Sequence, residues 1–259
     1  MSGQSFEEQP THKVFSEMGK RVLRPGGRDV TLELVDALDI SSDDDVVEFA
    51  PGMGQTAEYV LEQDPNSYTA VEIDREAASR LADEIEGPDR RVVVGHAGAT
   101  DLDSSSADVV IGEAMLTMQP DDGKAEIVRE ANRLLRSGGS YGIHEFALRP
   151  DDIDEETKSR IRDDLSQVAQ VDPRPLTAKR WVEILASAGF DEVWRTRAPM
   201  DLLEPRRVIS DEGLLGALRF GLNVATTPSA RQRIRRMRAI SERYGDHLEA
   251  IAIVAKSEK

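Results

Sequence analysis

Two glycines that directly follow an apolar segment give the clearest chemical signal in this chain. Residues 46–57 read VVEFAPGMGQTA, so a predicted strand runs into Gly52 and Gly54 and a helix begins at once. Glycine lets the backbone turn sharply and approach a ligand closely, and the first amides of a helix lack partners within the helix. The letters also fit the G-x-G-x-x-A pattern of nucleotide-cofactor sites. A tight turn without a ligand would explain the same letters, so the turn needs support from its surroundings.

An acidic residue in the expected place supplies that support. Glu72 ends the next apolar segment, 18 residues beyond Gly54. A carboxylate there can accept hydrogen bonds from both hydroxyls of a cofactor ribose. Nicotinamide cofactors and S-adenosylmethionine are both held in this way, and these two features alone do not separate them. We expect Glu72 to bind ribose rather than to remain a solvated carboxylate.

Short apolar segments alternate with amphipathic ones along the chain. The predicted strands cover 45–50, 68–73, 91–95, 107–111, 140–146, 190–197 and 249–256. Continuous apolar strands joined by helices are typical of a mostly parallel sheet with helices on both faces. We predict one α/β domain over residues 1–259 with a doubly wound, seven-stranded sheet. Its parts are an N-terminal helical segment (1–40), a cofactor-binding core (41–197), a helical insertion (198–247) and a final strand (248–259).

The overall composition narrows the class of protein. Hydrophobic residues make up 39% of the 259 residues, which suits a globular chain, and no apolar run reaches the length of a membrane helix. The first 20 residues lack the apolar core of a signal peptide, so we expect a cytoplasmic protein. The net charge of −16 disfavours nucleic acid and anionic membranes as partners. The chain has no cysteine, and we predict no metal site.

Four motifs in this order resemble the class I S-adenosylmethionine-dependent methyltransferases, in particular the bacterial small-molecule group that includes the quinone methyltransferases. They are Glu48-Phe49-Ala50-Pro51-Gly52-Met53-Gly54, Ala70-Val71-Glu72-Ile73-Asp74, Gly95-His96-Ala97 and Leu134-Leu135-Arg136-Ser137-Gly138-Gly139. The closing EAIAIVAK segment is similar to the family's reversed last strand. The resemblance covers about residues 40–197 and the final strand.

The resemblance implies S-adenosylmethionine as the cofactor and assigns residues to it. Glu48 would position the methionine ammonium, the turn would face the amino-acid and ribose parts, and Glu72 would hold the ribose. The family has glycine where this chain has Ala50, and aspartate where it has His96, which could accept from the adenine amino group only through a neutral ring nitrogen. The cofactor-binding set is Glu48, Ala50, Pro51, Gly52, Met53, Gly54, Glu72, Ile73, His96, Ala97 and Glu113.

Methyl transfer needs a base only if the acceptor must lose a proton. His144 and Glu145 end the fifth predicted strand and are the candidate catalytic residues. His144 is our preferred general base because imidazole titrates near neutral pH. A hydrogen-bonded structural role for His144 is equally open. The Arg24-Pro25-Gly26-Gly27 segment either forms a lid that brings Arg24 to the cofactor carboxylate or simply breaks a helix. We expect a small organic acceptor; the alternatives are a nicotinamide-dependent oxidoreductase and a non-catalytic binding module.

The helical insertion is expected to form a substrate cap or a homodimer contact. Its apolar residues could line a pocket or pack in a core: Leu214, Leu215, Leu218, Phe220 and Leu222. Its second helix carries an arginine run that could grip an acidic substrate or form a solvated face: Arg231, Arg233, Arg235, Arg236 and Arg238.

Overall fold

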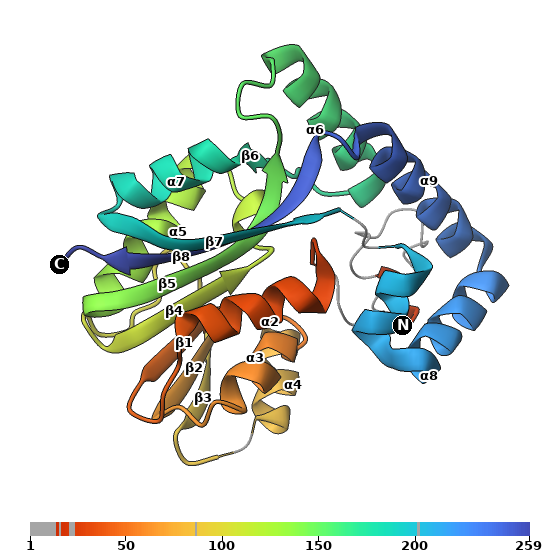
Figure 1. Cartoon of the computed structure of the whole chain (residues 1–259). Coiled ribbons are helices and arrows are strands. Elements are labelled where there is room, and N and C mark those ends of the chain that lie inside the picture. Colours follow the sequence, from red (N-terminus) through yellow and green to blue (C-terminus); the bar gives the residue numbers. More distant parts are fainter. Residues whose placement is uncertain (1–13, 16, 21–23, 86, 201–202) are drawn as a thin grey trace.

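A mixed sheet runs through the centre of the molecule (Figure 1). The computed structural model describes residues 14–15, 17–20, 24–85, 87–200 and 203–259. The strands are β1 (Asp45–Phe49), β2 (Ser67–Glu72), β3 (Arg90–Val94), β4 (Ala107–Glu113), β5 (Leu135–Leu148), β7 (Phe190–Pro199) and β8 (Leu248–Ser257). Their spatial order is β3-β2-β1-β4-β5-β8-β7, and β8 pairs antiparallel with both of its neighbours while the other pairs are parallel. The predicted seven-stranded, mostly parallel sheet is confirmed.

Two details of the sheet differ from the prediction. Strand β5 begins at Leu135 rather than at residue 140, because a register shift against β4 takes in the turn at Gly138, whose φ is 74°. A further strand, β6 (Leu176–Thr177), pairs with the end of β5. Two residues are too short for a side-chain pattern, so the sequence gives no signal for β6.

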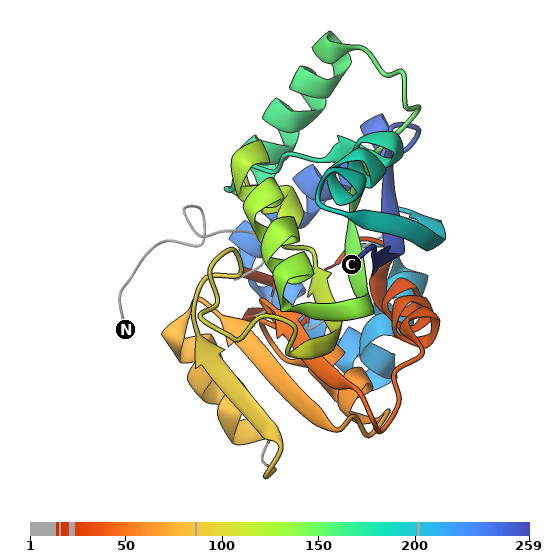
Figure 2. The ribbon, with the colours of Figure 1, turned by 90° about the vertical axis from the view of Figure 1, so that its left-hand side faces the viewer.

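Helices cover both faces of the sheet. One face carries α2 (Gly27–Leu38), α3 (Gln55–Leu61) and α4 (Arg75–Glu84), and the other carries α5 (Asp121–Leu134) and α7 (Ala178–Ser187). Figure 2 shows the yellow-green α5 and the red-orange α2 on opposite sides of the strands. The Asp74 side chain accepts from two amides at the start of α4, and Thr177 accepts from one at the start of α7. These capping residues explain where the two helices begin.

A third apolar core lies beyond the carboxyl ends of the parallel strands. It joins α6 (Glu155–Ala169), α8 (Pro205–Thr226) and α9 (Pro228–Tyr244) to the end of β5 and the start of β8. Strand β7 ends and β8 begins at this edge, where Pro199 pairs with Glu249, so the intervening helices must stand above it (Figure 1). We call these three helices the cap.

The cap helices carry exposed apolar residues on α8. The helical backbone geometry is interrupted at Gly213, whose φ of 71° bends α8 into two parts. Leu214, Leu218 and Phe220 line a groove of about 410 Å³ between α8 and α9, whereas Leu215 points to solvent with 85% of its surface exposed. None of the described helices is long and apolar enough to cross a membrane. Within the predicted N-terminal helical segment (1–40), residues 1–13, 16 and 21–23 lie outside the described residues.

Candidate active site

The glycine turn lies at the carboxyl end of β1, between this strand and α3. Gly52 and Gly54 have φ values of 59° and 73°. A Cβ atom on Gly54 would lie 2.7 Å from Leu81, whereas one on Gly52 would meet only the Ala50 carbonyl at 3.9 Å. No side chain caps the first turn of α3, which leaves its amides available to a ligand. Ala50 itself has φ 50°, a conformation that glycine adopts more easily.

The surroundings of Glu72 fit an adenosine. Its carboxylate accepts from the backbone amides of Gly52 (3.2 Å) and Asp74 (2.9 Å), which fix its orientation. A carboxylate has about four acceptor positions, so two remain for the two ribose hydroxyls. Three apolar side chains at the ends of β2 and β3 and in the turn are exposed: Ile73 (65%), Val94 (45%) and Met53 (40%). A flat, weakly polar base would cover surface that is otherwise left in water.

Glu48 is a buried carboxyl group at the end of β1. It accepts a 2.6 Å hydrogen bond from the hydroxyl of Tyr68, which comes from β2. Burial raises the pKa of Glu48 to about 8, even though the bond from Tyr68 lowers it; the neighbouring charges of Glu113 and Glu72 add to the rise. Without a ligand, Glu48 therefore keeps its proton at neutral pH.

Glu113, at the end of β4, gathers four partners from separate parts of the chain. One oxygen accepts from Thr31 of α2 (2.9 Å) and contacts Nδ1 of His144 (2.7 Å), and the other contacts Arg24 and Thr56. Burial alone would raise the pKa of Glu113, but the charge of Arg24 and the hydrogen bonds from His144 and Thr56 lower it to about 2. The group is therefore an anion that ties α2, α3, β5 and the Arg24 segment together.

His144 has no nitrogen left for a substrate. Its Nε2 lies 2.6 Å from the carbonyl oxygen of Pro25, and its Nδ1 faces the ionised Glu113. Both ring nitrogens are therefore occupied by acceptors within the fold, and neither is free to take a proton from a substrate. The side chain is fully buried. The predicted general-base role of His144 finds no support in these contacts, which match the structural alternative.

Glu145 is buried, and its carboxylate is hydrogen-bonded to the backbone and side chain of residues 115–117. Its two oxygens accept from the amides of Met115 (3.0 Å), Leu116 (2.7 Å) and Thr117 (3.0 Å) and from the Thr117 hydroxyl (2.6 Å). These groups start the short helix η1 (Leu116–Met118). Successive strand residues point to opposite faces, and this is why His144 and Glu145 have different surroundings. The predicted catalytic role of Glu145 has no geometric support.

The hydrogen bonding of His96 limits the adenine contact that we predicted for this side chain. Nδ1 of His96 accepts from the amide of Gly98 at 3.0 Å, so in the neutral ring the proton lies on Nε2. This nitrogen can donate to a ring nitrogen of a base but cannot accept from an amino group. His96 is exposed and Ala97 is buried beside it.

The sequence patterns did not predict several residues that hydrogen-bond to the acidic side chains at the strand ends. Thr31, Thr56 and Thr117 are short hydroxyl side chains in helices or turns, where no spacing rule distinguishes them. The hydrogen bond of Tyr68 could have been predicted, because a tyrosine within an apolar strand needs a partner for its buried hydroxyl. Among the described residues, no group of three or more His, Asp or Glu side chains could hold a metal ion.

Replacing Glu145 by Ala separates a structural role from a catalytic one. The variant would leave three amides and a hydroxyl unpaired at the start of η1, at a cost of about 3 kcal/mol or more. We expect the thermal unfolding midpoint, measured by circular dichroism, to fall by several degrees. Glu183→Ala, at an exposed position on α7, is the control. An unchanged midpoint would contradict the structural role of Glu145.

Comparisons with known proteins identify the kind of domain to which this fold belongs. A family model described as a methyltransferase domain matches residues 46–139. A protein of Haemophilus influenzae described as uncharacterised is 32% identical over 235 residues, which cover 89% of this chain and 91% of the relative.

Solved structures of low sequence identity share the fold. One is a Galdieria sulphuraria protein with the provisional name sarcosine dimethylglycine methyltransferase, at 14% identity and a TM-score of 0.73 over 96% of this chain and 99% of that one. Another is phosphoethanolamine N-methyltransferase 2 of Haemonchus contortus in complex with S-adenosyl-L-methionine, at 15% identity and a TM-score of 0.72 over 100% of this chain and 61% of that one.

The strand order decides against the nicotinamide alternative. Dinucleotide-binding sheets run in the order 3-2-1-4-5-6, whereas here the reversed β8 lies between β5 and β7. The methyltransferase domain model and the shared fold agree on one cofactor, S-adenosylmethionine. The chain therefore contains a class I S-adenosylmethionine-dependent methyltransferase domain.

Proposed function

We propose that this methyltransferase acts on a small organic acceptor enclosed between the sheet edge and the cap. The observation that carries this proposal is the third apolar core, which holds α6, α8 and α9 above the strand ends. A cap with a core of its own suits a compact acceptor better than a long polymer. The net charge of −16 also opposes the close approach of nucleic acid phosphates.

The three strand-end carboxylates suit a cationic cofactor. Glu48, Glu72 and Glu113 lie close enough for the charges of Glu72 and Glu113 to raise the pKa of Glu48, and Arg24 is the cation that lowers it. Bound S-adenosylmethionine supplies a methyl group activated by a positively charged sulfur. We propose that Glu72 accepts from the ribose, that Glu48 accepts from the ammonium, and that Ile73, Met53 and Val94 contact the adenine. His96 would donate to an adenine nitrogen through Nε2.

We assign His144 a positioning role in place of the base role. Its bond to the Pro25 carbonyl holds the Arg24–Gly27 segment against Glu113, while Arg24 reaches Glu113 and Thr56 directly. This segment closes one side of the strand-end space and helps to exclude water from it. Because the methyl group is already activated, orientation and water exclusion can supply much of the rate. An acceptor that needs no proton removed fits this arrangement.

Glu72→Ala should weaken cofactor binding. The variant loses two charge-assisted hydrogen bonds to the ribose, each worth about 1.5–3 kcal/mol. We expect the Kd for S-adenosylhomocysteine to rise at least tenfold in calorimetric titration, with Glu76→Ala on the exposed side of α4 as the control. An unchanged Kd would remove Glu72 from the site.

Cofactor binding should release a proton from Glu48. With its pKa near 8, the free group is mostly protonated at pH 7, and an ammonium beside it favours the ionised form. We expect titration of S-adenosylhomocysteine at pH 7, in buffers of different ionisation enthalpy, to show the release of close to one proton per cofactor. Glu48→Gln should release none. A wild-type protein that binds without releasing a proton would contradict the assigned role of Glu48.

A substitution at His144 distinguishes positioning from base chemistry. His144→Phe frees the Pro25 carbonyl and removes one donor from Glu113, so a positioning role predicts severalfold weaker binding of S-adenosylhomocysteine. His144→Gln, which keeps a donor, should restore part of the affinity. A general base would leave this affinity unchanged in both variants, and that outcome would refute the positioning role. Thermal unfolding of each variant checks that it is folded.

A further inference from the structure

Helix α2 begins without a capping side chain of its own. Its N-cap residue is Gly26, so the first amides of the helix need acceptors from elsewhere in the fold. Oδ1 of Asp211, on α8, accepts from the backbone amide of Arg28 at 3.0 Å, although the two residues are 183 positions apart. The cap thus supplies an acceptor for the first turn of α2, where the helix dipole also favours a negative charge.

The Asp211 carboxylate is buried between α8 and the N-terminal part of the chain. Its Oδ2 lies 3.2 Å from Nζ of Lys20, and neither side chain is exposed to solvent. A buried charge is stable only when its partners are complete, and Asp211 has an ammonium group and a backbone amide. Gly27 makes this approach possible, because a Cβ atom there would overlap the Asp211 carboxylate. The glycine at this position therefore allows α2 to begin against α8.

The first turn of α2 lies between two residues that contact Glu113. Arg24, four residues before Arg28, contacts one Glu113 oxygen, and Thr31, three residues after Arg28, donates to the other at 2.9 Å. Arg24 also donates to the Thr31 hydroxyl at 3.1 Å. Because Arg24 and Thr31 flank the Arg28 amide along the chain, a bond that fixes this amide also helps to fix both contacts to Glu113.

Glu113 acts on groups of the proposed cofactor site. Burial is the main cause of the raised pKa of Glu48; the charge of Glu113 adds to the rise, and the charge of Arg24 opposes it. Thr56, in the first turn of α3 after the glycine turn, contacts both Glu113 and Arg24. A displacement of Arg24 would therefore change the ionisation of Glu48 and the support of the glycine turn.

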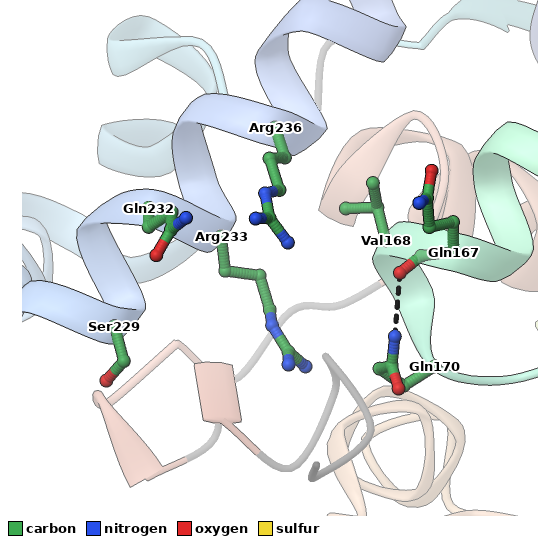
Figure 3. Close-up of a pocket in the computed structure, with 7 residues that line it drawn as sticks. All are labelled: Gln167, Val168, Gln170, Ser229, Gln232, Arg233 and Arg236. Atoms are coloured by element: carbon green, nitrogen blue, oxygen red, sulfur yellow. Dashed lines mark hydrogen bonds between the residues drawn. The ribbon is translucent and has the colours of Figure 1, made fainter. Parts of the chain in front are cut away.

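Helix α8 is one part of the cap and shares the third apolar core with α6 and α9. Figure 3 shows another side of the cap, where Arg233 and Arg236 extend from α9 toward Gln167 and Gln170 at the end of α6. Because the three helices pack in a common core, Asp211 connects α2 to the cap as a whole rather than to one helix.

We infer that Asp211 is a positioning residue for S-adenosylmethionine, which acts from the cap through the first turn of α2 on Arg24 and Thr31 and so on Glu113. The inference rests on the proposed function, because it takes the strand-end carboxylates as the cofactor site. It makes the affinity for the cofactor depend on how the cap sits on α2. An acceptor that holds the cap in this position would then strengthen cofactor binding, and the cofactor would strengthen acceptor binding by the same factor.

Three substitutions remove the interactions of Asp211 in turn. Lys20→Met removes the ion pair and keeps the bond to the Arg28 amide, Asp211→Asn removes the charge but keeps an acceptor, and Asp211→Ala removes both interactions. The Kd for S-adenosylhomocysteine is measured by calorimetry, and thermal unfolding is followed by circular dichroism. We expect Kd to stay nearly unchanged in Lys20→Met, to rise by about fivefold or more in Asp211→Ala, and to rise by less in Asp211→Asn.

A purely structural role gives a different result in this series. All three variants break the same buried ion pair, so all should unfold at a lower temperature. An unchanged Kd in both Asp211 variants, or an equal rise in Kd in Lys20→Met and Asp211→Ala, would overturn the inference. If Asp211→Ala does not fold, the comparison of Asp211→Asn with Lys20→Met decides in the same way. Asp29→Asn is the control, because its exposed bond to Arg207 (2.7 Å) also joins α2 to α8 and should leave Kd nearly unchanged.

A double-mutant cycle tests the route through α2. Thr31→Val removes the donor from α2 to Glu113, so Asp211→Asn should raise the Kd for S-adenosylhomocysteine less in this background than in the wild-type protein. Effects that simply multiply would contradict the route through Thr31.

Glu72→Ala separates this inference from the assignment of the cofactor site. A higher Kd in Glu72→Ala with wild-type Kd values in the Asp211 variants would refute the role of Asp211 and leave the cofactor site in place. A wild-type Kd in all of these variants would refute both.

Discussion

The buried Glu113 carboxylate holds the functional edge of this enzyme together. It receives Arg24 from the segment before α2, Thr31 from α2, Thr56 from α3 and His144 from β5. A buried anion is costly unless its partners are complete, so these four segments must meet at one point. Through Pro25, His144 extends the same network to the Arg24–Gly27 segment. The positions of the glycine turn, α2 and the Arg24 segment all depend on this one charge.

The carboxyl groups at the ends of β1 and β4 differ in their ionisation. Glu113 stays ionised because cations surround it, whereas burial leaves Glu48 protonated at neutral pH. Glu72 is oriented by two backbone amides. A cationic group bound beside Glu48 would favour the ionised form of this carboxyl group, which would couple cofactor binding to the loss of its proton. The cap stands above this edge on an apolar core of its own.

Sequence patterns predicted the sheet, most element boundaries and the class of cofactor, because apolar strands, a glycine turn and a strand-end acid are local features. They could not assign His144 and Glu145. Both were known to end a strand, but their roles depend on the Pro25 carbonyl and on the amides of η1, which are distant in sequence. Strand alternation explains why the two side chains have different surroundings. The backbone conformation of Ala50 could not be predicted from the sequence either, because a φ of 50° is unusual for alanine.

We propose that the carboxylates at the ends of β1 and β2 bind S-adenosylmethionine rather than a nicotinamide cofactor. Calorimetric titration of the wild-type protein with S-adenosylhomocysteine, run in parallel with reduced nicotinamide cofactor, tests it most directly. The account predicts saturable binding of S-adenosylhomocysteine at one site per chain and no heat of binding from the nicotinamide cofactor. Binding of the nicotinamide cofactor alone would contradict the account and make the glycine turn a dinucleotide site.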